Sequence, residues 1–392
     1  MQFIRTDDLK PGMRLAKPIY NKMGVLLYER ETSLTQQGIV SIHNFGLIGI
    51  YILEPAEPAP PLSEDELEFE RFQTIYLFQL KENIALILAS KKPDGLASLA
   101  EAIVNKYGTL KHKLNFTQNI RSSADYYYKH SLNVAILSVM MAARMHFNHE
   151  QQLAIVYASL LHDIGLLQLA EDLVEKDAKK YTPEELSMLN QMMHKGYQLL
   201  QPDLNPYQLP EPALRILSQL TQGYYHPSVA QTETIKWLSG TRVIHVANEY
   251  DNLTAMNINK EPVSEVIAIR FLNEYSNIYD VNIVRALTDC ISIVPTGCCV
   301  ELSNGEKAMV VAGNPNSFMK PVVLLFSNNI LCDLDSPAYS RSLQIADIMH
   351  TMDNRIKIDS ETLKQFKTDK YLLKTLERIH EKKIRLGQDL DE

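Results

Sequence analysis

The stretch Leu160-Leu161-His162-Asp163-Ile164-Gly165 decides how this sequence is interpreted, because an adjacent His and Asp follow an apolar segment. An imidazole nitrogen and a carboxylate oxygen can bind one divalent metal ion, and the Asp can also bridge two ions. A second histidine, His130, lies upstream on another segment with a helical apolar pattern. Taken alone, the His-Asp pair is a weak indication, because histidines hydrogen-bonded at buried helix ends are common. Its weight therefore depends on the rest of the chain.

Composition limits the class of protein. The 392 residues are 45% hydrophobic and 22% charged, which is typical of a globular protein with more than one folding unit. The formal net charge of -8 gives no general attraction to a nucleic acid polymer or an anionic membrane. No C-x-x-C spacing occurs, so reduced structural thiols are expected at Cys290, Cys298, Cys299 and Cys332. Without an apolar leader or span, we expect a cytoplasmic protein with no membrane span.

The chain is predicted to be mainly α and to have five segments. These are a small β-rich N-terminal domain, a Pro-rich linker, a helical connector, a helical bundle, and a β-hairpin extension with a C-terminal helix. Their expected bounds are 1–53, 54–62, 63–109, 110–290 and 291–392. The linker prediction depends on four prolines between residues 55 and 61, which remove backbone donors and favour extended chain.

Local signals support these divisions. Ser63-Glu64-Asp65-Glu66 has the pattern of a capping box, and Thr182-Pro183-Glu184-Glu185 combines a cap, a Pro at the first helical position and a Glu at the third. Asn304-Gly305 separates two alternating runs, which predicts a β-hairpin with a type I′ turn. From Glu361 onward the charged sequence returns to a helical pattern.

Six segments occur in the order and near-spacing of one family. They are His130-Ser131-Leu132-Asn133-Val134, the Leu160–Gly165 stretch, Thr182-Pro183-Glu184-Glu185, Gly196-Tyr197, Arg242-Val243-Ile244 and Asp251-Asn252-Leu253-Thr254. Through them, residues 110 to 290 resemble the HD-GYP proteins, a branch of the HD metal-dependent phosphohydrolases. The opening Leu9–Ala16 resembles the small domain that often precedes HD-GYP units, and Val300–Glu306 resembles a β extension found after them.

The resemblance implies a fold, a chemistry and a ligand set. It implies an HD-type helical bundle that holds two or three divalent metals, usually iron or manganese, and hydrolyses the bacterial messenger cyclic di-GMP. His130, His162 and Asp163 stand at three ligand positions of the motif. Asp163 would be the metal-bridging carboxylate, and it is the residue to which a catalytic role is assigned.

Several other positions of the family motif are replaced. A Glu ligand becomes Tyr126, a phosphate-binding Lys becomes Leu166, a ligand His becomes Met192, and a ligand Asp becomes Asn248. An adjacent His-His pair falls on Gln219-Leu220, and the Gly-Tyr-Pro signature is reduced to Gly223-Tyr224-Tyr225-His226-Pro227. Asp163 is thus the one carboxylate kept of the three that the family places at the metals.

Charge disfavours a binuclear centre, because two divalent ions bring four positive charges and an amide oxygen offsets none. A single ion, Fe, Mn or Zn, could be held by His130, His162 and Asp163, with Asn248 or water completing the shell. His194 lies two residues after Met192, about 200° around a helix, so it should point away from the site. His226 and His245 are left open as compensating ligands.

The favoured hypothesis is a degenerate HD-GYP signalling protein of bacterial origin. It would bind cyclic di-GMP or another signalling protein, as a binding or scaffolding module with little or no hydrolysis. The alternative is an active metal-dependent cyclic di-GMP phosphodiesterase with a mononuclear site, which needs His194, His226, His245 or Asn248 near the trio. A third hypothesis is a structural module that forms a homodimer. It is favoured if His130 and Asp163 lie far apart, or if the pocket is filled by Leu166, Met192 and Leu220.

Overall fold

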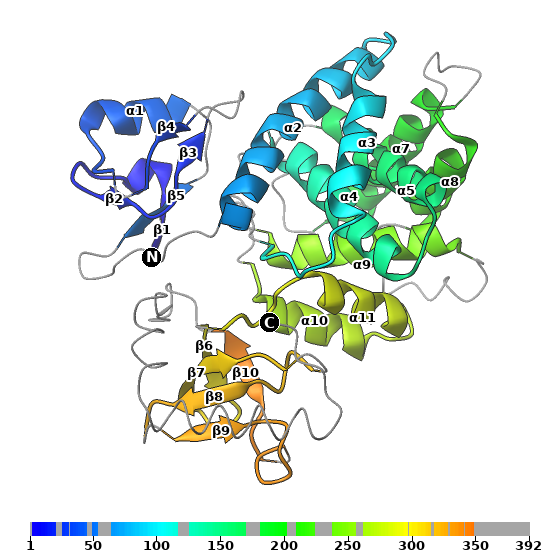
Figure 1. Cartoon of the computed structure of the whole chain (residues 1–392). Helices are drawn as coiled ribbons and strands as arrows, with labels where there is room; N and C mark the ends of the chain where they lie inside the picture. Colours follow the sequence, from blue (N-terminus) through cyan, green and yellow to red (C-terminus); the bar gives the residue numbers. More distant parts are fainter. Residues whose placement is uncertain are drawn as a thin grey trace.

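The computed structural model is mainly α-helical, with small sheets in its N-terminal and C-terminal parts (Figure 1). This confirms the predicted fold class. The structure describes residues 2–20, 26–30, 32–44, 49–53, 64–116, 125–169, 181–201, 209–223, 237–255, 262–296, 298–314, 317–327, 330–340 and 342–348. The predicted linker, Ser63 and the helical pattern from Glu361 onward lie outside these residues.

The N-terminal unit has its own core. Its elements are β1 (Gln2–Arg5), η1 (Thr6–Asp8), β2 (Arg14–Leu15), β3 (Ile19–Tyr20), β4 (Leu26–Tyr28), α1 (Gln36–Asn44) and β5 (Gly49–Leu53). Strands β1, β5 and β2 form an antiparallel sheet in that order, and β3 pairs with β4. Their apolar side chains pack with Ile39 and Ile42 of α1 in a cluster separate from the main core. Gly12, at φ +89°, takes the left-handed conformation in the predicted turn.

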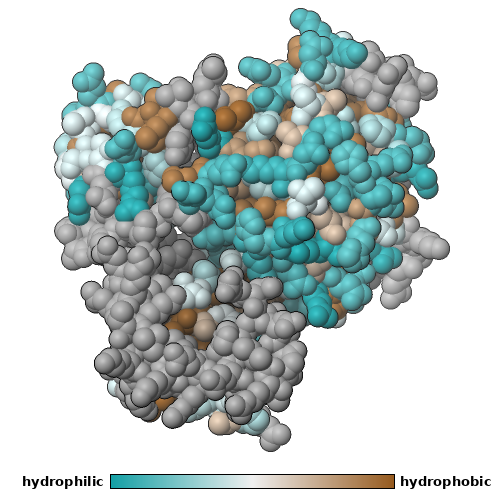
Figure 2. All heavy atoms as spheres, viewed as in Figure 1, coloured by the Kyte–Doolittle hydropathy of each residue, from teal (hydrophilic) through white to brown (hydrophobic). Residues whose placement is uncertain are grey.

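The helical region is built around one buried helix. Its elements are α2 (Glu64–Leu88), α3 (Leu96–Tyr107), α4 (Tyr126–Arg144), α5 (His149–Leu161), η3 (Leu166–Gln168), α7 (Pro183–Leu199), α8 (Glu211–Gly223), α9 (Ser239–Thr254), α10 (Glu265–Glu274) and α11 (Val281–Cys290). Every residue of α4 from His130 to Ala142 is buried, because α2, α3, α5, α9 and α11 all pack against this helix. The face of the bundle seen in Figure 2 is largely hydrophilic.

Capping explains where two of these helices begin. The predicted capping box at α7 is confirmed: Thr182 Oγ1 accepts the Glu185 N–H at 3.3 Å, and the Thr182 N–H donates to Glu185 Oε2 at 2.8 Å. A second capping box, not predicted, joins Asn148 and Gln151 at the start of α5. The start of α5 is thereby fixed shortly after α4 ends.

The C-terminal part is a five-stranded antiparallel sheet in the order β10-β6-β7-β8-β9. Its strands are β6 (Cys299–Leu302), β7 (Lys307–Ala312), β8 (Val322–Leu325), β9 (Leu331–Asp333) and β10 (Ile345–Ile348). The predicted hairpin between β6 and β7 is confirmed, but the predicted type I′ turn is wrong. Gly305 has a positive φ of +82° and Asn304 does not, because the Leu302 N–H bonds to Glu306 O around a three-residue loop. The four cysteines are buried and form no disulfide.

Among the residues that the structure describes, there is no helix of the length and apolar character needed to cross a membrane.

The C-terminal sheet is attached to the bundle through α10. Arg270 donates hydrogen bonds to the carbonyl oxygens of Ile345 and Ala346 in β10. Ser264, which caps α10, is hydrogen-bonded to Asp347.

Two glycines allow α7 to cross the chain immediately after the His-Asp pair. A Cβ on Gly165 would lie 2.0 Å from the Met192 carbonyl oxygen, and a Cβ on Gly196 would lie 2.5 Å from the Gly165 nitrogen. Both distances are far shorter than any van der Waals contact, and the opposing atoms belong to the backbone. A side chain at either position would therefore push α7 away from the turn that carries Asp163.

We predict that Gly196→Ala lowers the free energy of unfolding by about 1–3 kcal/mol, the cost typical of overpacking a core. Gly313→Ala is the matched control, because a Cβ there meets nothing within 4 Å. Urea unfolding followed by circular dichroism measures both variants. Equal stability of the two variants would contradict the close approach of α7.

Candidate metal centre

Four side chains predicted to bind metal come together inside the bundle. His130 lies on α4, His162 and Asp163 directly follow α5, and Asn248 lies on α9; all four are buried. Asn248 Oδ1 lies 2.8 Å from His130 Nε2 and 3.3 Å from His162 Nε2. Asp163 Oδ2 lies 3.6 Å from His130 Nε2. One ligand atom from each of His130, His162 and Asp163 fits within 4.8 Å, so this group could hold a metal ion.

The helix lengths explain this meeting. A connection of four residues joins the end of α4 to the start of α5, so the two helices pack side by side in opposite directions. From His130 to Arg144, α4 extends about 21 Å, and from His149 to His162, α5 returns about 20 Å. The end of α5 therefore arrives beside the first turns of α4, where His130 stands.

The hydrogen bonds of the two histidines fix their tautomers. His130 Nδ1 lies 2.6 Å from Asp251 Oδ2, and His162 Nδ1 lies 2.7 Å from the Ser159 carbonyl oxygen. A carboxylate and a carbonyl can only accept, so each Nδ1 carries the proton and donates it. In the neutral rings, each Nε2 then presents a lone pair towards Asn248 and Asp163. This is the arrangement of metal-binding histidines whose outer nitrogen is held by a second group.

Burial favours the neutral form of His162. Desolvation lowers the pKa of His162, although the nearby Asp163 charge opposes this shift. Asp163 Oδ1 is buried and has no hydrogen-bond partner among the described residues. Two nitrogen lone pairs, a carboxylate and an amide oxygen thus face one another, and such groups repel unless a cation lies between them. The donor set fits one divalent ion.

Aromatic and apolar side chains take the place of the missing charged groups. The Tyr126 ring, at the family's Glu position, stacks on His130 with 6.3 Å between centroids and 4° between planes. Burial raises the pKa of Tyr127 well above its usual value, and the Asp163 charge adds to the shift, so this phenol is neutral. Leu166, at the family's Lys position, packs with Leu189, Met193 and the Tyr127 ring. The side chains named on this flank of the centre are aromatic or aliphatic, and none of them carries a positive charge.

The structure separates the other histidines from the trio. His194 is exposed on α7, as predicted. His245 is buried between the rings of Trp237 and Tyr279, whose centroids lie 4.9 and 5.0 Å from that of the imidazole. Within the described part of the chain it belongs to no group that could hold a metal. His226, together with residues 224–227 of the eroded signature, lies outside the described residues, so its role stays a prediction. Met192 is half-buried on α7.

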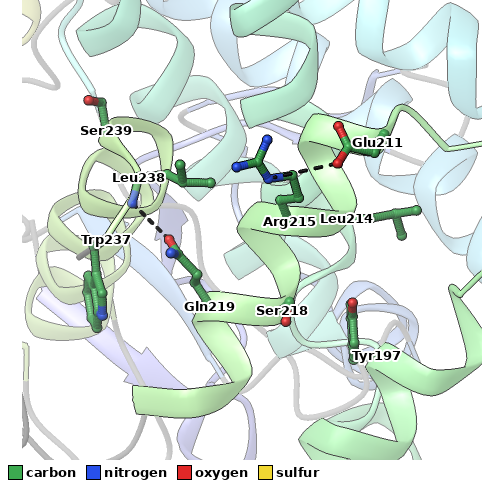
Figure 3. A pocket seen from close by; sticks show the side chains of 9 residues that line it. All are labelled: Tyr197, Glu211, Leu214, Arg215, Ser218, Gln219, Trp237, Leu238 and Ser239. Atoms are coloured by element: carbon green, nitrogen blue, oxygen red, sulfur yellow. Dashed lines mark hydrogen bonds and ion pairs between the residues drawn. The ribbon is translucent and has the colours of Figure 1, made fainter. Parts of the chain in front are cut away.

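Gln219, at the position of the family's His-His pair, supports α9. Its Oε1 accepts the Leu238 N–H at 2.8 Å and the Thr241 hydroxyl at 2.7 Å. The same amide borders an open pocket of ≈ 750 Å³ between α7, α8 and α9 (Figure 3). The lining residues are Tyr197, Glu211, Leu214, Arg215, Ser218, Gln219, Trp237, Leu238 and Ser239. None of the four predicted ligands lines this pocket, and Leu220 is buried in the main core.

The sequence analysis assigned no role to two polar residues that support Asp251, the hydrogen-bond partner of His130. Asn133 donates to Asp251 Oδ1 at 3.0 Å, and Gln73 of α2 donates to Asn133 Oδ1 at 2.6 Å. Asn133 follows His130 by three residues, so a search for polar residues one helical turn from a ligand would find it. Gln73 stands outside every recognised segment, and no sequence signal points to it.

The sequence matches a known protein family and two curated relatives. Residues 87–283, half of the chain, match the HD domain family. The chain belongs to the HD domain family. It is 25% identical over 207 residues to cyclic di-GMP phosphodiesterase PA4108 of Pseudomonas aeruginosa, covering 53% of this chain and 49% of that protein. It is also 25% identical over 200 residues to cyclic di-GMP phosphodiesterase PdeB of Borreliella burgdorferi, covering 50% and 51%.

The HD domain protein therefore spans about half the length of the curated relatives it matches. Among solved structures, Bd1817, a HDG"Y"P protein from Bdellovibrio bacteriovorus, aligns with a TM-score of 0.44 and 14% identity. That alignment covers 74% of this chain and 98% of the other. The family match and the curated relatives confirm the resemblance to HD-GYP proteins.

The burial of His245 makes the stability of the protein depend on pH. Burial lowers its pKa from 6.5 to about 4, so the unfolded chain binds a proton at higher pH than the folded chain. Stability from this group is present above pH 6.5 and is lost as the pH falls towards 4. We predict that wild-type protein loses about 2 kcal/mol more than His245→Phe between pH 7 and pH 5. Urea unfolding at both pH values measures this difference, and parallel losses would contradict it.

Proposed function

We propose that this HD domain protein is a degenerate HD-GYP-type module that binds one divalent ion and cyclic di-GMP, with little or no hydrolysis, in a bacterial signalling system. The observation that carries the proposal is the buried ligand set, with two imidazoles, the Asp163 carboxylate and the Asn248 amide. The two curated relatives are named cyclic di-GMP phosphodiesterases, which supports this dinucleotide as the ligand.

Charge balance supports a single ion. One divalent cation brings two positive charges, and two buried carboxylates face it: Asp163 directly and Asp251 through His130. These charges cancel. A second divalent ion would leave two uncompensated positive charges in a site closed to water, which costs several kcal/mol per charge even after relaxation. Asn248, in place of a ligand Asp, cannot supply the missing charge.

The residues around the centre support binding without turnover. A bound divalent ion would polarise a phosphate oxygen and lower the pKa of a bound water. The chain would have to position the phosphodiester and stabilise the charge that develops on it. At the position of the family's phosphate-binding Lys, Leu166 packs instead against Leu189 and Met193. The remaining chain groups at the centre would hold the ion and orient His130, but they offer that developing charge no cation.

One observation favours an alternative. An active mononuclear phosphodiesterase requires a fourth protein ligand, and Asn248 Oδ1 lies 2.8 Å from His130 Nε2. Two imidazoles, a carboxylate and an amide could leave coordination positions open for water and substrate. The structural dimerisation hypothesis has less support, because His130 and Asp163 approach to 3.6 Å and Leu166 lies in a separate apolar cluster.

We predict that protein purified without oxygen holds one iron or manganese ion per chain. Elemental analysis measures this content, titration calorimetry measures cyclic di-GMP binding, and chromatography measures hydrolysis. Asp163→Asn should abolish metal retention by removing the one charged ligand. His194→Ala, an exposed histidine on α7, is the matched control and should retain the ion. Turnover of cyclic di-GMP by the one-metal protein would support the mononuclear enzyme, and failure to bind the dinucleotide would overturn the proposal.

A restored ligand set should accept a second ion. In the double variant Tyr126→Glu and Asn248→Asp, two carboxylates are added at positions that approach His130, through stacking and a 2.8 Å contact. These two negative charges would offset a second divalent cation, so metal content should rise to two ions per chain. Single variants serve as controls. Content of one ion in the double variant would show that charge is not what limits the count.

A further inference from the structure

A series of buried hydrogen bonds leads into the metal centre from α2. Gln73 Nε2 donates to Asn133 Oδ1 at 2.6 Å, and Asn133 Nδ2 donates to Asp251 Oδ1 at 3.0 Å. Asp251 Oδ2 accepts the His130 Nδ1–H at 2.6 Å. These four side chains are buried, with Gln73 6% exposed. Gln73 precedes the HD domain match, which begins at residue 87.

The direction of every bond in this series is determined. The Asp251 carboxylate can only accept, so the Asn133 amide must turn its NH₂ group towards it. The Asn133 oxygen then faces Gln73, which meets it with a donor. If the Asn133 amide were rotated by half a turn, two acceptors would oppose each other at Asp251 and two donors at Gln73. Gln73 therefore holds Asn133 in the one orientation that serves Asp251.

The orientation of Asp251 matters for the ligand His130. Asn133 holds one oxygen of this carboxylate and His130 Nδ1 binds the other, so the carboxylate cannot turn without breaking a bond. As long as Asp251 accepts the Nδ1 proton, His130 Nε2 keeps its lone pair towards Asn248 and Asp163. Loss of this support would let His130 adopt the other tautomer, with a proton where the ion binds.

We infer that Gln73 is a positioning residue of the metal centre, acting on His130 through Asn133 and Asp251, and that α2 is part of the site. This inference rests on the proposed binding of one ion. It adds a residue from outside the family-matched region, on a helix whose Phe69, Phe72, Leu80 and Ile84 belong to the main core. Figure 1 shows α2 alongside the helices of the bundle.

The test compares two buried amides on the same helix in the full-length protein. Gln73→Met keeps the length of the side chain and removes its donor. Asn83→Leu removes a buried amide that bonds to Gly95 N at 2.9 Å and Gln79 O at 2.7 Å, away from the centre. Affinity is measured by titrating metal-free protein with Co²⁺ and following its visible absorption. The His130 tautomer is measured by ¹⁵N NMR of the metal-free protein.

Gln73→Met should weaken Co²⁺ binding about 3- to 10-fold, less than the roughly 10- to 100-fold loss typical for direct partners of ligands. It should also give His130 a mixture of tautomers, whereas Asn83→Leu should match wild type in both measurements. Gln73→Leu is the second variant if Gln73→Met does not fold. Wild-type affinity with an unchanged tautomer in the Gln73 variant, or an equal loss in Asn83→Leu, would overturn the inference. If wild-type protein binds no Co²⁺, the proposed function fails, and the tautomer of metal-free protein still tests Gln73.

Discussion

The return of α5 along α4 is the constraint on which the site depends. Because α4 is buried all round, its neighbours must pack along it, and the capping box at Asn148 fixes where α5 begins. The distance that α5 covers then sets where His162 and Asp163 arrive. Gly165 and Gly196 let α7 close over the turn that follows. The metal centre is thus a product of helix length and close backbone packing rather than of a flexible loop.

The chemistry of the site depends on the orientation of the two histidines and on how few charged ligands surround them. The Nδ1 atoms of His130 and His162 donate to Asp251 and to the Ser159 carbonyl oxygen, away from the centre. The Nε2 atoms therefore face the Asp163 carboxylate and the Asn248 amide. The proposed occupancy of one cation follows from the same groups, since Asp163 and Asp251 supply two negative charges between them. Replacing a ligand Asp by Asn248 keeps the shape of the ligand and removes its charge.

The sequence could predict which four side chains meet at the candidate metal centre, because each occupies a motif position with a recognisable neighbour. His162 and Asp163 are adjacent in sequence, His130 begins the buried part of α4, and Asn248 precedes Asp251 by one helical turn. The cap at Thr182 and the β6–β7 hairpin were equally visible, since such signals act over three or four residues. The role of Gln73 could not be predicted, because its partner Asn133 lies 60 residues further along the chain. The type I′ turn is wrong because the hydrogen bond between Leu302 and Glu306, rather than the Asn-Gly pair, sets the loop length.

Helix α2 contacts the N-terminal unit through Glu70 and the metal centre through Gln73, and these two contacts differ in strength. On one side, the buried Glu70 faces Lys17 of the N-terminal unit at 3.9 Å, a long ion pair whose lysine is partly exposed. On the other side, breaking the buried bond between Gln73 and Asn133 leaves polar groups unsatisfied at about 1–3 kcal/mol. Apolar packing in the main core adds to the second side. The side of α2 that faces the metal centre is therefore held both by a buried hydrogen bond and by the main core.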